Sequence, residues 1–179
     1  MTAKGRDELT LCFSPEEIEA RVSILAQELN SKLANERVVA VCVLRGAVLF
    51  FADLVRKLSI PNLVFDFCTL SSYGDKDVSS GEVSVRTWLS QDISDAHVLI
   101  VEDIVDTGRS MQTFLARLAL CPQKGITLCA LLDKSESRVC AVPIDYACFQ
   151  VKAGFYVGYG LDFAQRYRHL PGIYTLHQN

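Results

Sequence analysis

Buried strand-like runs alternate with helix-like runs along this chain, and this alternation limits the folds that it can adopt. The strand-like runs, which are rich in aliphatic and β-branched residues, are 38–44, 63–70, 98–101 and 126–132. The helix-like runs, which have apolar residues at helical spacing, are 15–33, 47–58 and 110–120. Strands that are apolar throughout are buried on both faces, as in parallel sheets covered by helices. We therefore predict an α/β fold, a twisted parallel sheet flanked by helices, with ligands at the carboxyl ends of its strands.

The chain length and composition predict one globular domain over residues 1–179. Half of the residues are apolar and 22% are charged, which excludes a disordered chain. Ser14, Pro15 and Glu17 form a capping-box pattern that starts the first helix at residue 15. The uncharged stretches are too short to span a membrane, and residues 1–10 are too polar for a signal peptide. We expect no membrane partner.

The charge and the cysteines indicate where the protein acts. Eighteen basic and 21 acidic residues give a net charge of −3, so no general positive field attracts nucleic acid. The seven cysteines contain no C-x-x-C pair and mostly lie in apolar runs. This context favours buried, reduced thiols over disulfides or a metal site, and it predicts a cytoplasmic protein.

Residues 98–110 carry the strongest functional signal. A strand is followed by two adjacent acids, Glu102 and Asp103, and then by a tight turn that leads into a helix. The turn consists of Asp106, Thr107, Gly108, Arg109 and Ser110. Its N–H groups, its hydroxyl groups and the helix N-terminus can hold one phosphate monoester. The acids would repel that phosphate, and they suit ribose hydroxyls or Mg²⁺ instead.

Two other interpretations of this segment stay open at this point. The acids could simply cap the following helix, or the segment could start a response-regulator receiver domain. A receiver domain would place this strand near the N-terminus, whereas about a hundred residues precede it here.

Residues 71–86 interrupt the alternation with a polar, glycine-containing segment. Its length is typical of a mobile lid over a binding site, although a surface hairpin explains it equally well. Residues 163–179 look like a short covering segment.

Several motifs together resemble one family. Residues 102–110 look like the phosphoribosyl-pyrophosphate (PRPP) motif of type I phosphoribosyltransferases. Other segments resemble the 6-oxopurine branch, the hypoxanthine-guanine phosphoribosyltransferases, and these are 43–47, 70–74, 131–134, 155–162 and 166–170. The matches run in collinear order along nearly the whole chain. The resemblance implies the type I phosphoribosyltransferase fold, with a small hood formed by the terminal segments.

The resemblance assigns roles around PRPP. It places residues 106–110 around the 5′-phosphate, and Glu102 and Asp103 beside the ribose hydroxyls and a Mg²⁺ ion. It places the pyrophosphate at a cis Leu44–Arg45 bond, with the contact residues Arg45, Gly46, Ser72, Tyr73 and Arg168.

The resemblance also assigns a purine site. Lys134 corresponds to the donor to the purine 6-oxo group, which selects 6-oxopurines over adenine. Phe155 corresponds to the stacking aromatic, the Tyr156 carbonyl faces ring position 2, and Asp162 lies near a second Mg²⁺. Asp106, facing purine N7, is the candidate general base or hydrogen-bond acceptor.

Two departures from the family pattern affect these expectations. Residues 152–154 are Lys-Ala-Gly, where the family often has proline and a polar pair, so the choice between hypoxanthine and guanine stays open. Arg109 replaces a frequent lysine, which is a modest change because the turn binds mainly through N–H groups.

We therefore expect a purine salvage enzyme that uses PRPP, a purine base and Mg²⁺, and that forms a homo-oligomer, a dimer or tetramer. The alternative is a PRPP-binding regulatory protein without significant catalysis. Such a protein would need a basic face to bind nucleic acid, and it would not need the purine-site residues.

Overall fold

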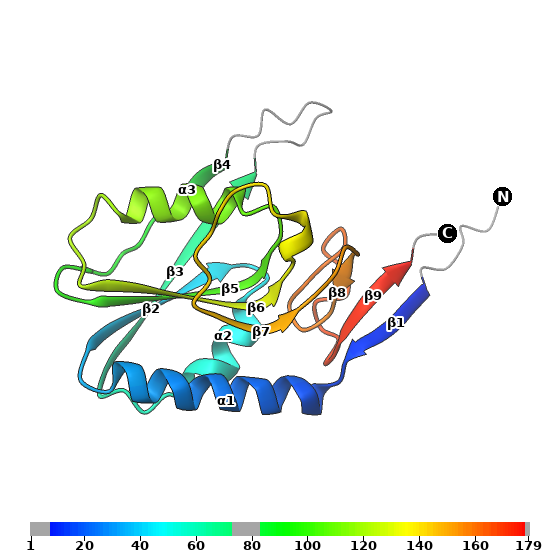
Figure 1. The fold of residues 1–179 in the computed structure, drawn as a ribbon, viewed down its shortest axis with the longest axis horizontal. Coiled ribbons are helices and arrows are strands. Elements are labelled where there is room, and N and C mark those ends of the chain that lie inside the picture. Colours follow the sequence, from blue (N-terminus) through cyan, green and yellow to red (C-terminus); the bar gives the residue numbers. More distant parts are fainter. Residues whose placement is uncertain (1–7, 73–82, 178–179) are drawn as a thin grey trace.

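The computed structural model describes residues 8–72 and 83–177, and Figure 1 shows their arrangement. The helices are α1 (Pro15–Leu33), α2 (Val48–Val55), α3 (Arg109–Leu118) and a short 3-10 turn, η1 (Ser135–Ser137). The strands are β1 (Glu8–Phe13), β2 (Arg37–Leu44), β3 (Asn62–Ser72), β4 (Val83–Thr87), β5 (His97–Val105), β6 (Gly125–Asp133), β7 (Tyr146–Gln150), β8 (Tyr156–Val157) and β9 (Ile173–His177).

The central sheet has the strand order β4-β3-β2-β5-β6-β7. Its neighbouring strands from β3 to β7 pair in parallel, and β4 joins the β3 edge in antiparallel orientation. The predicted α/β class with a parallel sheet is confirmed. The four predicted strands are its β2, β3, β5 and β6, which lie side by side in the sheet.

Helices cover both faces of this sheet, and the alternation of side chains along β2 shows the two cores. Val38, Ala40 and Cys42 are buried in one cluster together with α1 and α2. Val39, Val41 and Val43 are buried in the other cluster together with α3. Successive strand residues point to opposite faces. A strand covered on both sides is therefore apolar at every position, which is the pattern seen in the sequence.

The predicted boundaries hold best where a local signal fixes them. In the Ser14 capping box, the Glu17 N–H donates to Ser14 Oγ at 3.3 Å and the Ser14 N–H donates to Glu17 Oε2 at 2.8 Å. The first helix accordingly spans the predicted residues 15–33. The second helix was predicted to reach residue 58, but α2 ends at Val55 and tighter turns follow it, with Lys57 N–H bonded to Leu54 O.

One boundary error affects the site. Strand β5 was predicted to end at residue 101 with the two acids beyond it, whereas the strand continues to Val105. Glu102 and Asp103 therefore lie inside the strand. The ladder to β6 continues past them through Ile104 and Val105, so pairing overrides the low strand preference of acidic residues.

A second, three-stranded antiparallel sheet, with the order β1-β9-β8, lies at one end of the molecule (Figure 1). Its strands β1 and β9 come from the two terminal segments, so it corresponds to the expected hood. The sequence patterns missed all three strands, and the predicted covering segment 163–179 contains β9. The short strand β8 ties residues 156–157 of the predicted purine site to both terminal segments.

The predicted lid, residues 71–86, is only partly described. Its two ends are paired strands, with Ser71 opposite Ser84 and Ser72 opposite Val83. Residues 73–82, which include Tyr73, lie outside the described residues. The lid and the single-domain organisation stay predictions. A helix long and apolar enough to cross a membrane is not found in residues 8–72 and 83–177.

Candidate active site

The predicted phosphate turn, residues 106–110, connects β5 to α3. Gly108 is the N-cap of α3 and has φ +85°, a left-handed conformation that favours glycine. No side chain caps the first turn of α3 among the described residues, so its N–H groups stay available. A cavity of about 100 Å³ is lined by Asp106, Thr107, Gly108 and Ser110, and also by Glu102. This arrangement fits one phosphate group at a helix N-terminus.

The acids Glu102 and Asp103 lie in the last part of β5, against the chain that follows β2. Glu102 lines the phosphate-turn cavity, whereas Asp103 lines a second cavity. A Cβ atom at Gly46 would lie 1.5 Å from Asp103 Oδ2, so only glycine allows this close approach. The Leu44–Arg45 bond just before Gly46 is cis, as the resemblance implies. The predicted pyrophosphate segment and the acidic pair are therefore neighbours.

Burial raises the pKa of both carboxyl groups in this acidic pair. It raises the pKa of the Glu102 carboxyl well above its usual range, and the neighbouring Asp103 charge adds to that effect. Burial also raises the pKa of Asp103, while hydrogen bonds from Glu102 and the Ile104 N–H and the positive charge of Arg168 act in the opposite direction. The buried Glu102 carboxylate and the partly buried Asp103 carboxylate therefore favour a proton, a cation or donating hydroxyl groups beside them.

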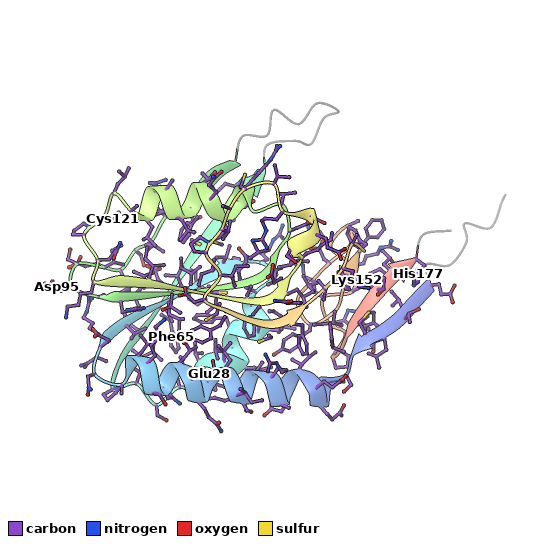
Figure 2. All side chains as sticks on the ribbon, viewed as in Figure 1. Glu28, Phe65, Asp95, Cys121, Lys152 and His177 are labelled. Carbon is purple, nitrogen blue, oxygen red and sulfur yellow. The ribbon has the colours of Figure 1, made fainter. Side chains whose placement is uncertain are left out.

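The second cavity, of about 180 Å³, brings the predicted purine-site residues together. It is lined by Lys134, Phe155, Tyr156, Asp162, Asp103, Ile104, Asp106, Gly154 and Leu161. Figure 2 shows Lys152, on the predicted rim, near β8, whereas Asp95 and Cys121 mark the opposite end of the sheet. Asp106 lines both cavities and so stands between the phosphate turn and the purine site.

Lys134 and Asp106 form an ion pair inside this second cavity. The distance from Lys134 Nζ to Asp106 Oδ2 is 2.9 Å, and the Lys134 side chain is only 12% exposed. The other carboxylate oxygen, Asp106 Oδ1, is buried without a hydrogen-bond partner within the described residues. Buried polar atoms are rarely left unpaired, so this oxygen is suited to accept from a ligand.

Phe155 has the exposure and support expected of a stacking aromatic. Its side chain is 44% exposed, which is high for a phenylalanine that only packs in a core. Phe163 contacts it edge to face, with ring centroids 5.4 Å apart and an interplanar angle of 83°. The sequence reasoning missed Phe163, although it directly follows Asp162, the last residue of the 155–162 motif. Leu161, which also lines the cavity, lies within that motif, whereas Gly154 belongs to the rim at residues 152–154 that departs from the family pattern.

Arg168 lies on the Asp162 side of the site. Its Nη2 contacts Asp162 Oδ1 at 2.6 Å, and its Nη1 donates to the Gly160 carbonyl at 2.7 Å. The guanidinium that was predicted to contact pyrophosphate therefore also holds the carboxylate predicted to lie near a second Mg²⁺. A ligand phosphate would compete with Asp162 for the same donors.

The structure does not bring all of the remaining predicted site residues into the two cavities. Arg45 and Arg109 have exposed side chains, and Arg109 does not line the phosphate-turn cavity. Ser72 is the last residue of β3. A larger hollow, about 790 Å³, lies between α1, α2 and residues 169–171, but it contains none of the predicted site residues.

Comparisons with known proteins identify the family of this chain. A family model described as "Phosphoribosyl transferase domain" matches residues 14–164. The chain is 40% identical over 167 residues to the hypoxanthine phosphoribosyltransferase of Buchnera aphidicola, covering 92% of this chain and 94% of that one. It is 36% identical over 171 residues to the hypoxanthine-guanine phosphoribosyltransferase of Streptococcus thermophilus, covering 96% and 94%.

The solved structures give the same result for the fold. A hypoxanthine-guanine phosphoribosyltransferase from Bacillus anthracis superposes with a TM-score of 0.88 at 31% identity, covering 96% of this chain and 100% of that one. The chain therefore belongs to the phosphoribosyl transferase family, and the resemblance read from the motifs is confirmed.

Proposed function

We propose that this protein transfers the 5-phosphoribosyl group from PRPP to N9 of a 6-oxopurine and releases pyrophosphate. The observation that carries this proposal is the position of Asp106, which lines both the phosphate-turn cavity and the cavity with Lys134 and Phe155. A sugar phosphate in the first cavity and a flat base in the second would meet beside this carboxylate. The names of the relatives, hypoxanthine and hypoxanthine-guanine phosphoribosyltransferases, support the same reaction.

The reaction passes through a transition state with positive charge on C1′ and the ring oxygen, as in glycoside hydrolysis. We assign the phosphate turn to positioning the 5′-phosphate, through the N–H groups of Thr107 and Gly108 and the Ser110 hydroxyl. The free oxygen of Asp106 accepts a hydrogen bond from purine N7 or removes its proton. Arg168 and the N–H groups near Arg45 and Gly46 bind the departing pyrophosphate.

Selection of the purine base is assigned to Lys134 and the residues near ring position 2, in the second cavity. Lys134 has three N–H donors, so it can keep its bond to Asp106 and also donate to a 6-oxo group. Adenine offers no acceptor of this kind at position 6. The choice between hypoxanthine and guanine is assigned to the surroundings of ring position 2, near Tyr156, Asp162 and the rim at residues 152–154.

Mg²⁺ is the cofactor that the acidic residues fit best. Glu102 and Asp103 are adjacent carboxylates, and burial raises the pKa of both. Mg²⁺ is typically held by one or two protein carboxylates together with phosphate oxygens and water. Asp162 lies across the second cavity and would contact a second ion. Mg²⁺ held by these carboxylates would supply positive charge beside the pyrophosphate.

A product assay tests this proposal against the alternative of a PRPP-binding regulatory protein. The protein is mixed with PRPP, Mg²⁺ and one of hypoxanthine, guanine, xanthine or adenine, and nucleotide and pyrophosphate are measured. With hypoxanthine or guanine, we expect nucleotide and pyrophosphate to form in equal amounts. With adenine, we expect little of either product. PRPP binding without any product would favour the regulatory protein.

We also propose that the protein forms a homo-oligomer and acts in the cytoplasm. Exposed apolar side chains lie on α2 and on the face of β3 that packs against it, and these are Val48, Leu49, Phe65 and Phe67. An apolar surface of this kind is typical of a protein interface. A monomer that is fully active at micromolar concentration in sedimentation experiments would contradict the oligomer.

The seven cysteines are free thiols, which supports a reducing compartment such as the cytoplasm.

A further inference from the structure

Arg138 lies just after η1, the short yellow helix that follows β6 in Figure 1, and no sequence motif singled it out. Its side chain is 16% exposed and reaches the predicted phosphate turn. Nε donates to the Asp106 carbonyl at 3.0 Å, and Nη2 donates to the Val105 carbonyl at 3.0 Å. Nη2 also contacts Asp133 Oδ1 at 2.5 Å. One guanidinium thus holds two successive carbonyls at the start of the turn.

The backbone after Arg138 holds the next carbonyl of the turn. The N–H groups of Val139 and Cys140 both donate to the Thr107 carbonyl, at 2.9 and 3.0 Å. The contact is close, because a Cβ atom at Gly108 would lie 2.9 Å from Arg138 Cδ and 2.7 Å from the Cys140 carbonyl oxygen. Three consecutive carbonyls, those of residues 105, 106 and 107, are therefore bound by residues 138–140.

This binding fixes the direction of the N–H groups. In a trans peptide the C=O and the following N–H point in opposite directions. Carbonyls held by residues 138–140 therefore direct the N–H groups of the turn away from that segment. Within the part of the chain that the structure describes, the Thr107 and Gly108 N–H groups donate no hydrogen bond. Both residues line the phosphate-turn cavity.

We propose that Arg138 is a positioning residue, which orients the peptide groups of the phosphate turn so that their N–H groups bind the 5′-phosphate of PRPP. The proposal rests on the proposed function for the identity of the ligand. Arg138 itself binds carbonyls and Asp133, so it acts through the backbone of the turn. Only the planar fork of an arginine presents rigid donors in these separate directions, whereas lysine is a single point charge on a flexible stem.

Arg21 provides a matched control. Its Nε donates to the Cys148 carbonyl at 2.9 Å, and its Nη2 donates to the Ala147 carbonyl at 3.3 Å. It therefore also bridges two successive carbonyls, but on β7 and away from both cavities. Replacing each arginine by lysine removes the same kind of contact in two places.

The experiment compares Arg138→Lys, Arg138→Met and Arg21→Lys with the unchanged protein. Calorimetry measures the Kd of ribose 5-phosphate, which carries the 5′-phosphate without pyrophosphate or base, and kinetics measure KM for PRPP and for hypoxanthine. For Arg138→Lys we expect the Kd of ribose 5-phosphate and KM for PRPP to rise about tenfold, with KM for hypoxanthine changed less than about twofold. Arg138→Met is expected to show a larger rise, and Arg21→Lys none.

The outcomes distinguish a positioning role of Arg138 from a purely structural role. They also distinguish failure of this proposal from failure of the proposed function. Unchanged ribose 5-phosphate binding in folded Arg138→Lys protein would overturn the proposal, as would an equal loss in Arg21→Lys. If Arg138→Met does not fold, the lysine variant still decides. If the unchanged protein makes no nucleotide while Arg138→Lys still weakens ribose 5-phosphate binding, the proposed function fails and the positioning role stands.

Discussion

Replacing Lys134 by alanine tests the purine site most directly. The Lys134 ammonium bonds to Asp106 at 2.9 Å and lines the same cavity as Phe155. A charge-assisted hydrogen bond contributes about 1.5–3 kcal/mol. Losing one to the 6-oxo group should lower kcat/KM for hypoxanthine and guanine alike, by about tenfold to about 150-fold. Adenine loses no such bond, so its rejection should weaken by a similar factor.

The structure adds a second effect of this substitution. Asp106 Oδ1 already has no partner within the described residues, and the loss of Lys134 would also deprive Oδ2 of its donor. We therefore expect kcat to fall together with base affinity. Lys134→Met serves as a control, because it removes the charge while roughly keeping the side-chain volume. If methionine and alanine give the same kinetics, the effect comes from charge and not from an enlarged cavity.

The assay is steady-state kinetics with hypoxanthine, guanine and adenine, together with calorimetry for PRPP. The Kd of PRPP should change less than about twofold, because the phosphate-turn cavity does not include Lys134. The reasoning would be refuted if Lys134→Ala left both oxopurines and the rejection of adenine unchanged while lowering the Tm. Lys134 would then be a structural residue.

Three further outcomes are expected. Asp106→Asn should lower turnover by about 10² or more while PRPP binding, measured by calorimetry, stays nearly intact; near-normal turnover would remove Asp106 from the chemistry. Glu102→Gln should abolish most activity yet stabilise the unliganded protein by on the order of 1 kcal/mol, about 2–4 °C in Tm, because a buried charge is removed; a lower Tm would contradict this. Burial lowers the pKa of His97 below its ordinary 6.5, so the folded state binds fewer protons than the unfolded state. The free energy of unfolding should therefore fall as pH drops below about 6.5, and denaturant titrations of His97→Asn should lack that part of the fall.

The sequence by itself determined the elements whose signals are local. The capping box at Ser14 fixed the start of α1, and continuous aliphatic runs identified four neighbouring strands of the central sheet. The turn at residues 106–110 was also predictable, because its glycine and hydroxyl residues stand directly between a strand-like run and a helix-like run. Short-range periodicity and capping involve residues only a few positions apart, so both patterns can be recognised in the sequence alone.

Only the tertiary structure decided how separate segments meet. The hood joins strands from both terminal segments, and neither β1 nor β9 is recognisable alone because their pairing is long-range. The Lys134–Asp106 pair spans 28 positions, and Arg138 reaches carbonyls 32 and 33 positions away. Such contacts depend on the register of β5 against β6, which places the two strand ends together. Register is set by the packing of the whole sheet, and no local pattern around Arg138 encodes it.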